Sequence, residues 1–304
     1  MTNGSIVTTK GKNVMLYRMY TENASLSATQ YLAPSKVQLG VNNSSALITD
    51  TELDYPIPLA DGVVNDNGDN QLAGSNGGDN TTDNTTTYKE GAGSSDNTAQ
   101  NLITTGSNTT KTWTISNLAT LGTIITDSKY AGLSLYIKDS IVLGNIVSIE
   151  IKLGSDSSNY YSLTFLNAVL DTGWNWLTNS GIVSSWTETG TVSGDIDTFI
   201  IEIITDDADD AFITRDVIYD LLRSWDYADT LSSFQASFPT FDYTNNEVTI
   251  RTYINSLQAN GFLISGVGVV NEDSTPLLLG EDTISDESKS STDEFTFVIK
   301  DRVL

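Results

Sequence analysis

The sequence predicts an all-β protein, because short strand patterns follow one another along most of its 304 residues. Turn signals rich in Gly, Asn and Asp separate these patterns, as at residues 154–156, 171–173 and 260–261. No window carries a long apolar stripe with the 3.6-residue period of a helix, so helices should be few and short. Together these three observations indicate stacked antiparallel sheets.

Two kinds of strand pattern occur. Residues 198–205 are almost continuously apolar, which is typical of a strand buried on both faces. The other segments alternate, which is typical of strands with one buried face. The residues expected on buried faces are Leu133, Leu135 and Ile137 in segment 131–138, Val147, Ile149, Ile151 and Leu153 in segment 146–153, and Tyr161, Leu163 and Phe165 in segment 160–166. Further strands are expected at residues 111–118, 216–222, 246–254, 262–270 and 294–302.

Residues 61–100 differ from the rest of the chain, since Asn, Asp, Thr, Ser and Gly dominate and few side chains can fill a core. On composition alone such a segment is a linker or lacks a fixed structure. We expect short edge strands within it, for example at residues 86–91.

Composition and charge exclude several classes of function. The chain has 39 acidic and 15 basic residues, a net charge of −24, which repels phosphate backbones and anionic lipid surfaces. It has no cysteine and no histidine, which excludes disulfides, zinc–thiolate sites and Ser–His–Asp or Cys–His catalysis. A pair of carboxylates remains for catalysis, but nothing in the sequence nominates a pair. The prediction is a protein that is not an enzyme, binds no nucleic acid and does not insert into a membrane.

The first residues carry no basic region followed by an apolar stretch, which predicts synthesis without a signal peptide. No apolar run approaches the roughly 20 residues that span a bilayer. The Thr-, Ser-, Asn- and Gly-rich composition nevertheless resembles that of extracellular β proteins. This combination is typical of a particle that is assembled in the cytoplasm and released by lysis, and predicts a virion location.

The two ends of the chain resemble a phage tail-fibre or collar-type module over residues 12–60 and 226–304. The likeness is carried by residues 35–41, 48–53 and 55–59 and, about 180 residues later, by 238–242, 248–251, 259–271, 277–280 and 293–304. In such modules one strand resembles "I-x-E-x-G-L-F-N"; here Gly266 replaces the acidic residue and Val269-Val270 replaces Leu-Phe. The resemblance implies a virion-attachment β-sandwich split into residues 1–61 and 224–304.

The residues between these halves resemble jelly rolls of the carbohydrate-binding-module type. The segments that carry this likeness are residues 88–94, 133–138, 153–161, 172–175, 196–203 and 216–220. The resemblance implies a jelly-roll β-sandwich at residues 62–223, inserted in a loop of the discontinuous host domain, where insertion costs little.

Four aromatic residues are candidates for saccharide binding, because sugar rings present flat C–H faces to aromatic rings. They are Tyr160, Tyr161, Trp176 and Trp186. Trp174 shares one face of a strand with Trp176, but after Gly173 core packing is favoured for it. Core packing is also the alternative for Trp176, Tyr160 and Trp186.

Four carboxylates fall within five residues between two expected strands, at Asp206, Asp207, Asp209 and Asp210. Oxygen ligands in a turn suit Ca²⁺, which jelly rolls of this type often carry, although the spacing is not that of an EF-hand. The alternative, a solvated acidic turn, is favoured. The sequence requires no cofactor, and a structural calcium ion is the one bound metal that it suggests.

The sequence therefore predicts a phage virion protein of the tail-fibre or appendage type. Its jelly roll would bind host surface polysaccharide weakly at many copies, and its host domain would contact other virion proteins or copies of itself. The candidate assembly residues are Val14, Leu16, Tyr17 and Tyr20. Two alternatives stay open: a capsid decoration protein whose jelly roll stabilises or coats the head, and a free carbohydrate-binding protein.

Overall fold

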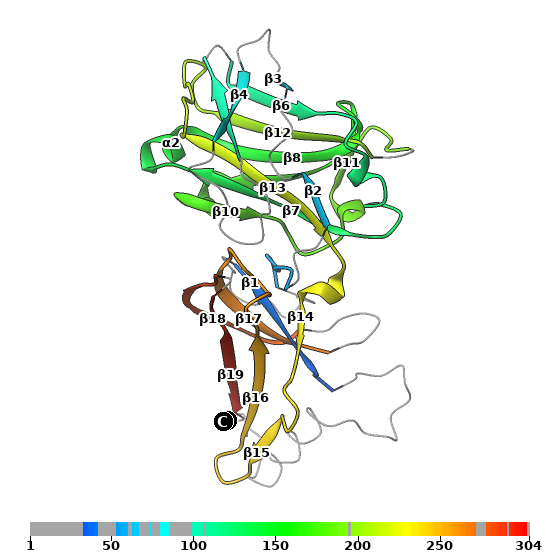
Figure 1. Ribbon diagram of the computed structural model, residues 1–304, viewed down its shortest axis with the longest axis vertical. Helices are drawn as coiled ribbons and strands as arrows, with labels where there is room; N and C mark the ends of the chain where they lie inside the picture. The colour runs from blue at the N-terminus through cyan, green and yellow to red at the C-terminus, as the bar shows by residue number, and fades with distance from the viewer. Residues whose placement is uncertain are drawn as a thin grey trace, which may run out of the picture. The chain divides into compact units, whose positions relative to one another are not determined.

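The chain divides into two compact units in a computed structural model (Figure 1). Unit 1 comprises Met1–Leu59, Thr230–Ala259 and Leu263–Leu304, and unit 2 comprises Ala60–Asp229 and Asn260–Phe262. The residues that the structure describes are 33–41, 53–59, 63–66, 73–74, 80–85, 99–105, 108–193, 196–271, 278–290 and 292–302. Within them antiparallel strands predominate and α2 (Ser140–Asn145) is the one α-helix, so the prediction of an all-β protein is confirmed.

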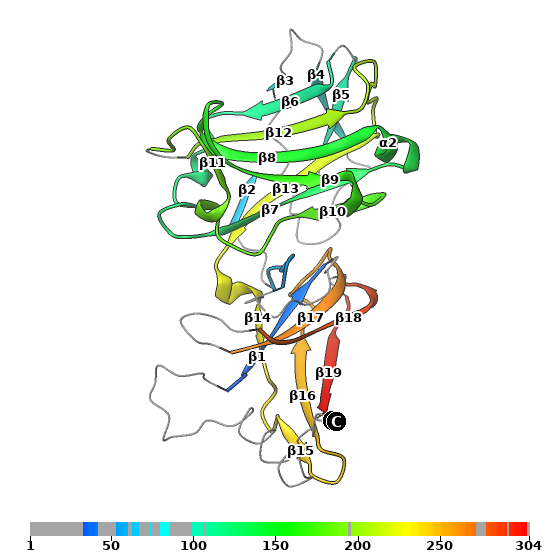
Figure 2. The ribbon, with the colours of Figure 1, turned by 180° about the vertical axis from the view of Figure 1, so that it is seen from behind.

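Unit 2 is a sandwich of two antiparallel sheets, which Figures 1 and 2 show from opposite sides. Sheet B has the order β10-β7-β13-β5-β4, with β2 also paired to β13, and sheet C has the order β11-β9-β8-β12-β6-β3. The strands of sheet B are β2 (Val63–Asp66), β4 (Asn80–Thr85), β5 (Ala99–Thr104), β7 (Tyr130–Ile137), β10 (Gly173–Leu177) and β13 (Val217–Trp225). Those of sheet C are β3 (Ala73–Gly74), β6 (Thr110–Ile115), β8 (Ile146–Asp156), β9 (Asn159–Leu166), β11 (Thr187–Thr189) and β12 (Thr198–Thr205).

Alternating apolar residues of both sheets form the core of unit 2. Leu133, Leu135 and Ile137 of β7 are fully buried, as their alternation predicts. The two sheets meet where Phe199 of β12 packs against Tyr219 of β13, with ring centroids 5.5 Å apart. This contact joins an inner strand of one sheet to an inner strand of the other.

Val147 departs from the predicted pattern of β8, because 44% of its surface is exposed whereas Ile149, Ile151 and Leu153 are buried. The expectation that it shares their buried face was wrong. Ile146 pairs with Thr205 and Ser148 with Ile204, so Val147 is an extra residue at a β-bulge. A bulge moves the alternation by one residue, and here it turns Val147 outward.

Helical segments in the described chain are short connections. Asp139 caps α2, accepting hydrogen bonds from the backbone N–H groups of Ile141 and Val142 at 3.0 Å each. No helix among the described residues is both long and apolar enough to cross a membrane. The 3₁₀ turns are η1 (Ala119–Leu121), η2 (Asn167–Val169), η3 (Val183–Ser185) and η4 (Tyr227–Thr230).

Unit 1 contains a four-stranded antiparallel sheet, sheet A, and a three-stranded one, sheet D. A buried polar side chain ties two segments of the chain together, since Gln38 donates to the Thr230 hydroxyl at 3.0 Å and accepts from the Leu53 N–H at 2.8 Å. Sheet A has the order β14 (Leu231–Ser233), β1 (Lys36–Gly40), β17 (Leu263–Val270) and β18 (Leu278–Ser288), and sheet D has the order β15 (Thr240–Asp242), β16 (Glu247–Ile254) and β19 (Phe295–Arg302).

The polar segment at residues 61–100 includes β2, β3, β4 and the start of β5 in its described parts. The edge strand expected at residues 86–91 lies outside the described residues.

Strand β8 requires glycine at position 154, where it pairs with Tyr160 of β9. A Cβ at this position would collide with the backbone oxygen of Asn159 and lie 2.7 Å from the Cα of Tyr160. A Cβ built on Gly144 would have no described neighbour within 4 Å. We expect Gly154→Ala to lower the free energy of unfolding by about 1–3 kcal/mol. The control Gly144→Ala, in α2, should leave it unchanged or raise it by up to about 1 kcal/mol. Urea unfolding measures both, and equal effects would contradict the packing described.

Candidate functional site

A row of side chains crosses four strands on the face of sheet B that points away from the core. Trp174 of β10 lies opposite Tyr136 of β7, which lies opposite Ile218 of β13. Ile218 in turn lies opposite Asn101 of β5. Because Tyr219, the neighbour of Ile218, packs into the core, the row must lie on the opposite face of the sheet. Ile218 and Asn101 are buried there, so the accessible part of the row is its Trp174 end. We call this surface the outer face of sheet B.

Trp174 and Tyr136 form an aromatic pair at one end of this row. Their ring centroids lie 5.5 Å apart with an angle of 61° between the planes, which is an edge-to-face arrangement. Trp174 is 36% exposed and Tyr136 is half-buried. One indole is therefore accessible and is supported from the side by a second ring.

The turn that leads into β10 is fixed by the side chain of Asn175. Its carboxamide oxygen accepts from the Asp171 N–H at 2.9 Å, and its nitrogen donates to the Asp171 carbonyl at 2.8 Å and to the Gly173 carbonyl at 3.1 Å. Gly173 has a φ of +96°, a conformation that favours glycine. These bonds hold the backbone on either side of Trp174, so the exposed indole is presented by a rigid segment.

Trp176 lies two residues further along β10 and belongs to a packed aromatic cluster. Its ring lies 5.4 Å from that of Trp225 and 5.0 Å from that of Phe262. Trp225 also stacks on Tyr130 at 6.3 Å. A Cβ at Gly132 would lie 2.6 Å from the Trp176 ring, so the indole lies directly over this glycine. Since Trp225 is 1% exposed, the cluster anchors β10 instead of offering an open surface.

Tyr160 lies on the other sheet, beside a group of charged residues. The Lys152 ammonium lies 5.0 Å from the centroid of its ring, 2.9 Å from a carboxylate oxygen of Glu202 and 3.3 Å from one of Glu150. Burial acts to lower the pKa of Lys152, but the hydrogen bond and charge of Glu202 and the charge of Glu150 outweigh it and raise the pKa. One face of the Tyr160 ring is thus occupied by a paired cation.

The structure does not bring the four predicted aromatic residues together. Tyr161 lies opposite Leu153 on the core-facing side of β9, and Trp186, after η3, is 6% exposed. Tyr160 and Tyr161 belong to sheet C, and Trp176 belongs to sheet B.

Trp174 and Tyr136 form an exposed pair that sequence reasoning did not identify. The preference for Trp174 as a core residue was wrong, because its register opposite Tyr136 turns it outward. One local signal was present for Tyr136. It alternates with Leu135 and Ile137, which were expected to face the core.

The acidic loop, residues 206–210, joins β12 to β13. Its carboxylates bond to their own backbone, Asp210 accepting from the Asp207 N–H at 3.2 Å and Asp207 from the Asp209 N–H at 3.1 Å. Burial and the neighbouring carboxyl groups raise the pKa of Asp210. Burial lowers the pKa of Lys111. The nearby charges of Asp210 and Asp207 act to raise this pKa, but burial outweighs them. No group of three or more acidic residues in the described chain is arranged to hold a metal ion, and the calcium site stays a prediction.

The predicted assembly residues Val14, Leu16, Tyr17 and Tyr20 lie outside the described residues.

Comparison with known proteins assigns no family. No family model matches the chain, and no curated protein matches it. A solved structure from work on the promiscuous specificity of carbohydrate-binding modules of the β-sandwich superfamily is similar at 17% identity with a TM-score of 0.34. The likeness covers 51% of this chain and 56% of that one, so the chain spans little more than half of that neighbour's length.

The paired cation on sheet C gives a pH-dependent prediction. Lys152→Met should lower the free energy of unfolding by about 1–3 kcal/mol at neutral pH, because it leaves two partly buried carboxylates without their partner. A raised lysine pKa contributes stability that is fully present below the ordinary value of 10.5 and is lost as the pH rises through the higher folded value. The difference in stability should therefore be constant between about pH 7 and 9 and shrink above pH 10.5.

The control is Lys300→Met. The Lys300 ammonium lies 2.9 Å from a carboxylate oxygen of Glu247, and the Lys300 side chain is 60% exposed. An exposed pair contributes at most about 1 kcal/mol, so this variant should change stability less. Urea unfolding at several pH values measures both variants. Equal losses, or a Lys152→Met difference that grows above pH 10.5, would contradict the assignment.

Proposed function

We propose that unit 2 binds saccharide chains through the Trp174–Tyr136 pair on the outer face of sheet B. The observation that carries this proposal is an indole that is 36% exposed and held by a hydrogen-bonded turn. The C–H face of a pyranose stacks on such a ring, and a ring that is already fixed loses little conformational entropy on binding. The proposed role is binding without catalysis.

The charges near this pair favour an uncharged saccharide. Asp171 precedes β10, Asp139 follows β7, and Asp216 precedes β13 at the same end of the sheet. Two cations lie at this end as well: Lys138, which is paired with Asp216 at 2.8 Å, and Arg215, which directly precedes Asp216. Together with the net charge of −24, these carboxylates disfavour uronates and sulfated sugars. A single stacked ring gives weak affinity, so useful attachment requires many copies.

We further propose that the chain is a structural component of a phage particle and displays this face toward host polysaccharide. The support is the sequence resemblance of residues 12–60 and 226–304 to tail-fibre or collar-type modules. Display at many copies on one particle supplies the multivalency that a weak saccharide site needs.

Substitution of Trp174 tests the saccharide site. Trp174→Ala should weaken binding of the full chain to an immobilised neutral polysaccharide by about tenfold or more, because it removes the stacking surface. Leu166→Ala, which removes an exposed apolar side chain on sheet C, should leave binding unchanged. Tyr160→Ala should also leave it unchanged, since that ring lies on the other sheet.

Affinity electrophoresis in neutral and in anionic polysaccharides measures this binding. Retardation of the wild type by a neutral polysaccharide that Trp174→Ala abolishes is the expected result. If no polysaccharide retards the wild type, or if Tyr160→Ala abolishes the retardation and Trp174→Ala does not, the proposed site is wrong.

Immunogold electron microscopy tests the particle location. We expect an antibody against the full chain to label tail appendages of particles from a producing lysate. Labelling of the head alone would contradict the appendage role and support decoration. Unlabelled particles beside abundant soluble antigen would overturn the virion proposal.

A further inference from the structure

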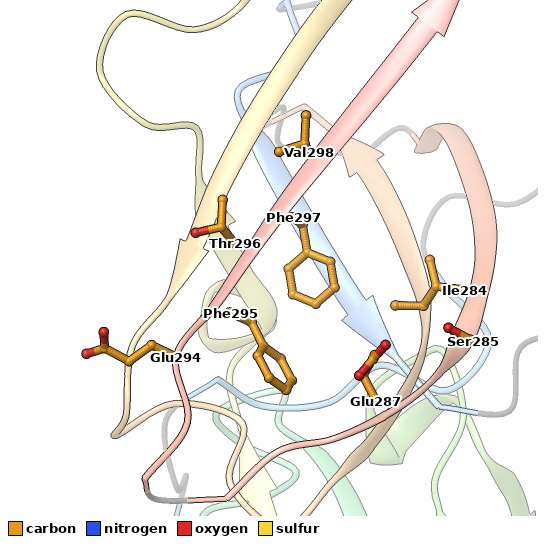
Figure 3. A pocket seen from close by; sticks show the side chains of 8 residues that line it. All are labelled: Ile284, Ser285, Glu287, Glu294, Phe295, Thr296, Phe297 and Val298. Atoms are coloured by element: carbon orange, nitrogen blue, oxygen red, sulfur yellow. The ribbon is translucent and has the colours of Figure 1, made fainter.

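Unit 1 contains an apolar groove between β18 and β19, with a volume of about 340 Å³ (Figure 3). Its floor is aromatic: Phe295 and Phe297 of β19 point toward Ile284 and Glu287 of β18. The two phenyl rings lie 6.2 Å apart in an edge-to-face arrangement, and both are half-buried. The residues that line the groove are Ile284, Ser285, Glu287, Glu294, Phe295, Thr296, Phe297 and Val298.

Both strands beside the groove lie at sheet edges. Among the described strands β18 ends sheet A and β19 ends sheet D. An edge strand presents backbone donors and acceptors that an added strand can use. The groove therefore combines an apolar floor with a backbone that can pair, which is the arrangement used in recognition of extended segments by β-augmentation.

The lining of the groove is also acidic. Glu287 of β18 and Glu294, just before β19, are exposed there, and none of the residues that line the groove is basic. The buried Lys289 lies 6.0 Å from the Phe295 ring, and its ammonium donates to the Ser290 carbonyl at 2.9 Å. An occupant should therefore be extended and should present both apolar and positively charged side chains to the groove.

Residues 10–20 of this chain have those properties. They contain Lys10, Lys12 and Arg18 and no acidic residue, in a protein of net charge −24. In an extended strand Val14, Leu16 and Tyr20 share one face with Lys10, Lys12 and Arg18, so that face carries both the apolar and the basic side chains. These residues lie outside the described part of the chain, so the match rests on their sequence.

We propose that residues 10–20 of a second copy of this chain occupy the groove between β18 and β19. Val14, Leu16 and Tyr20 of the segment cover Phe295 and Phe297, and the basic residues on the same face lie beside Glu287. Each copy then donates one segment and accepts another. Reciprocal exchange between two copies closes a dimer, whereas a head-to-tail contact builds a ring or an open array. This proposal is independent of saccharide binding.

A charge exchange tests the pairing, with self-association of the full chain measured by sedimentation velocity over a concentration series. The wild type should associate, and added salt should weaken the association. Glu287→Lys and Arg18→Glu should each raise the dissociation constant by about tenfold, and the two together should restore it to within about threefold. Glu188→Lys, an exposed site in unit 2, is the matched control and should change nothing.

An apolar substitution in the segment gives a second readout. Leu16→Asp should raise the dissociation constant by roughly 10- to 100-fold, because a charged side chain cannot cover the phenyl rings. Circular dichroism should show wild-type strand content for each variant. A wild type that stays monomeric at all concentrations would overturn the proposal. If Leu16→Asp also lowered the stability of that monomer, the segment would bind within its own chain instead of a second copy. Association that ignores both Leu16→Asp and Glu287→Lys would overturn it as well.

Discussion

Strand β13 is buried along all nine of its residues, and both faces of sheet B depend on it. On the core side Tyr219 packs against Phe199 and connects the two sheets. On the outer side Trp225 packs against Trp176 and holds β10 at the sheet. The outer face of an antiparallel sheet is commonly polar. Here β13 is buried on both faces, so aromatic side chains such as Trp225 and Trp176 fill the space on its outer side. The same anchoring positions Trp174, because it is two residues before Trp176 on β10.

The strand pattern of the sequence was sufficient to predict most of the fold. The continuous apolar run at residues 198–205 coincides with β12, and the alternation at 131–138 coincides with β7 to within one residue. Both signals are local, since they depend on the period of side chains along a single strand. The outward orientation of Val147 could not be predicted from such local signals. Its bulge arises from pairing with β12, about 60 residues later in the chain, and has no signature in its own segment.

The candidate site was harder to predict, because it depends on which strands become neighbours. The sequence places Trp174 and Trp176 on one face of a strand, which the structure bears out. It does not say that β7 lies beside β10, so the pairing of Trp174 with Tyr136 could not be inferred. The Lys152 cluster has the same origin, since Glu202 reaches it from another strand. Local periodicity thus predicts which face of a strand a residue lies on, whereas the strand register determines which residues are its neighbours.

The central claim is that the exposed indole of Trp174 is the saccharide contact. The five tryptophans provide five separate indole N–H signals for a direct measurement by two-dimensional NMR, each assigned by substitution. During titration with a neutral oligosaccharide the Trp174 signal should shift progressively. The signal of Trp113, in the core of unit 2, and that of the buried Trp186 should stay in place. A shift confined to Trp186, or five unchanged signals at saturating oligosaccharide, would contradict the account.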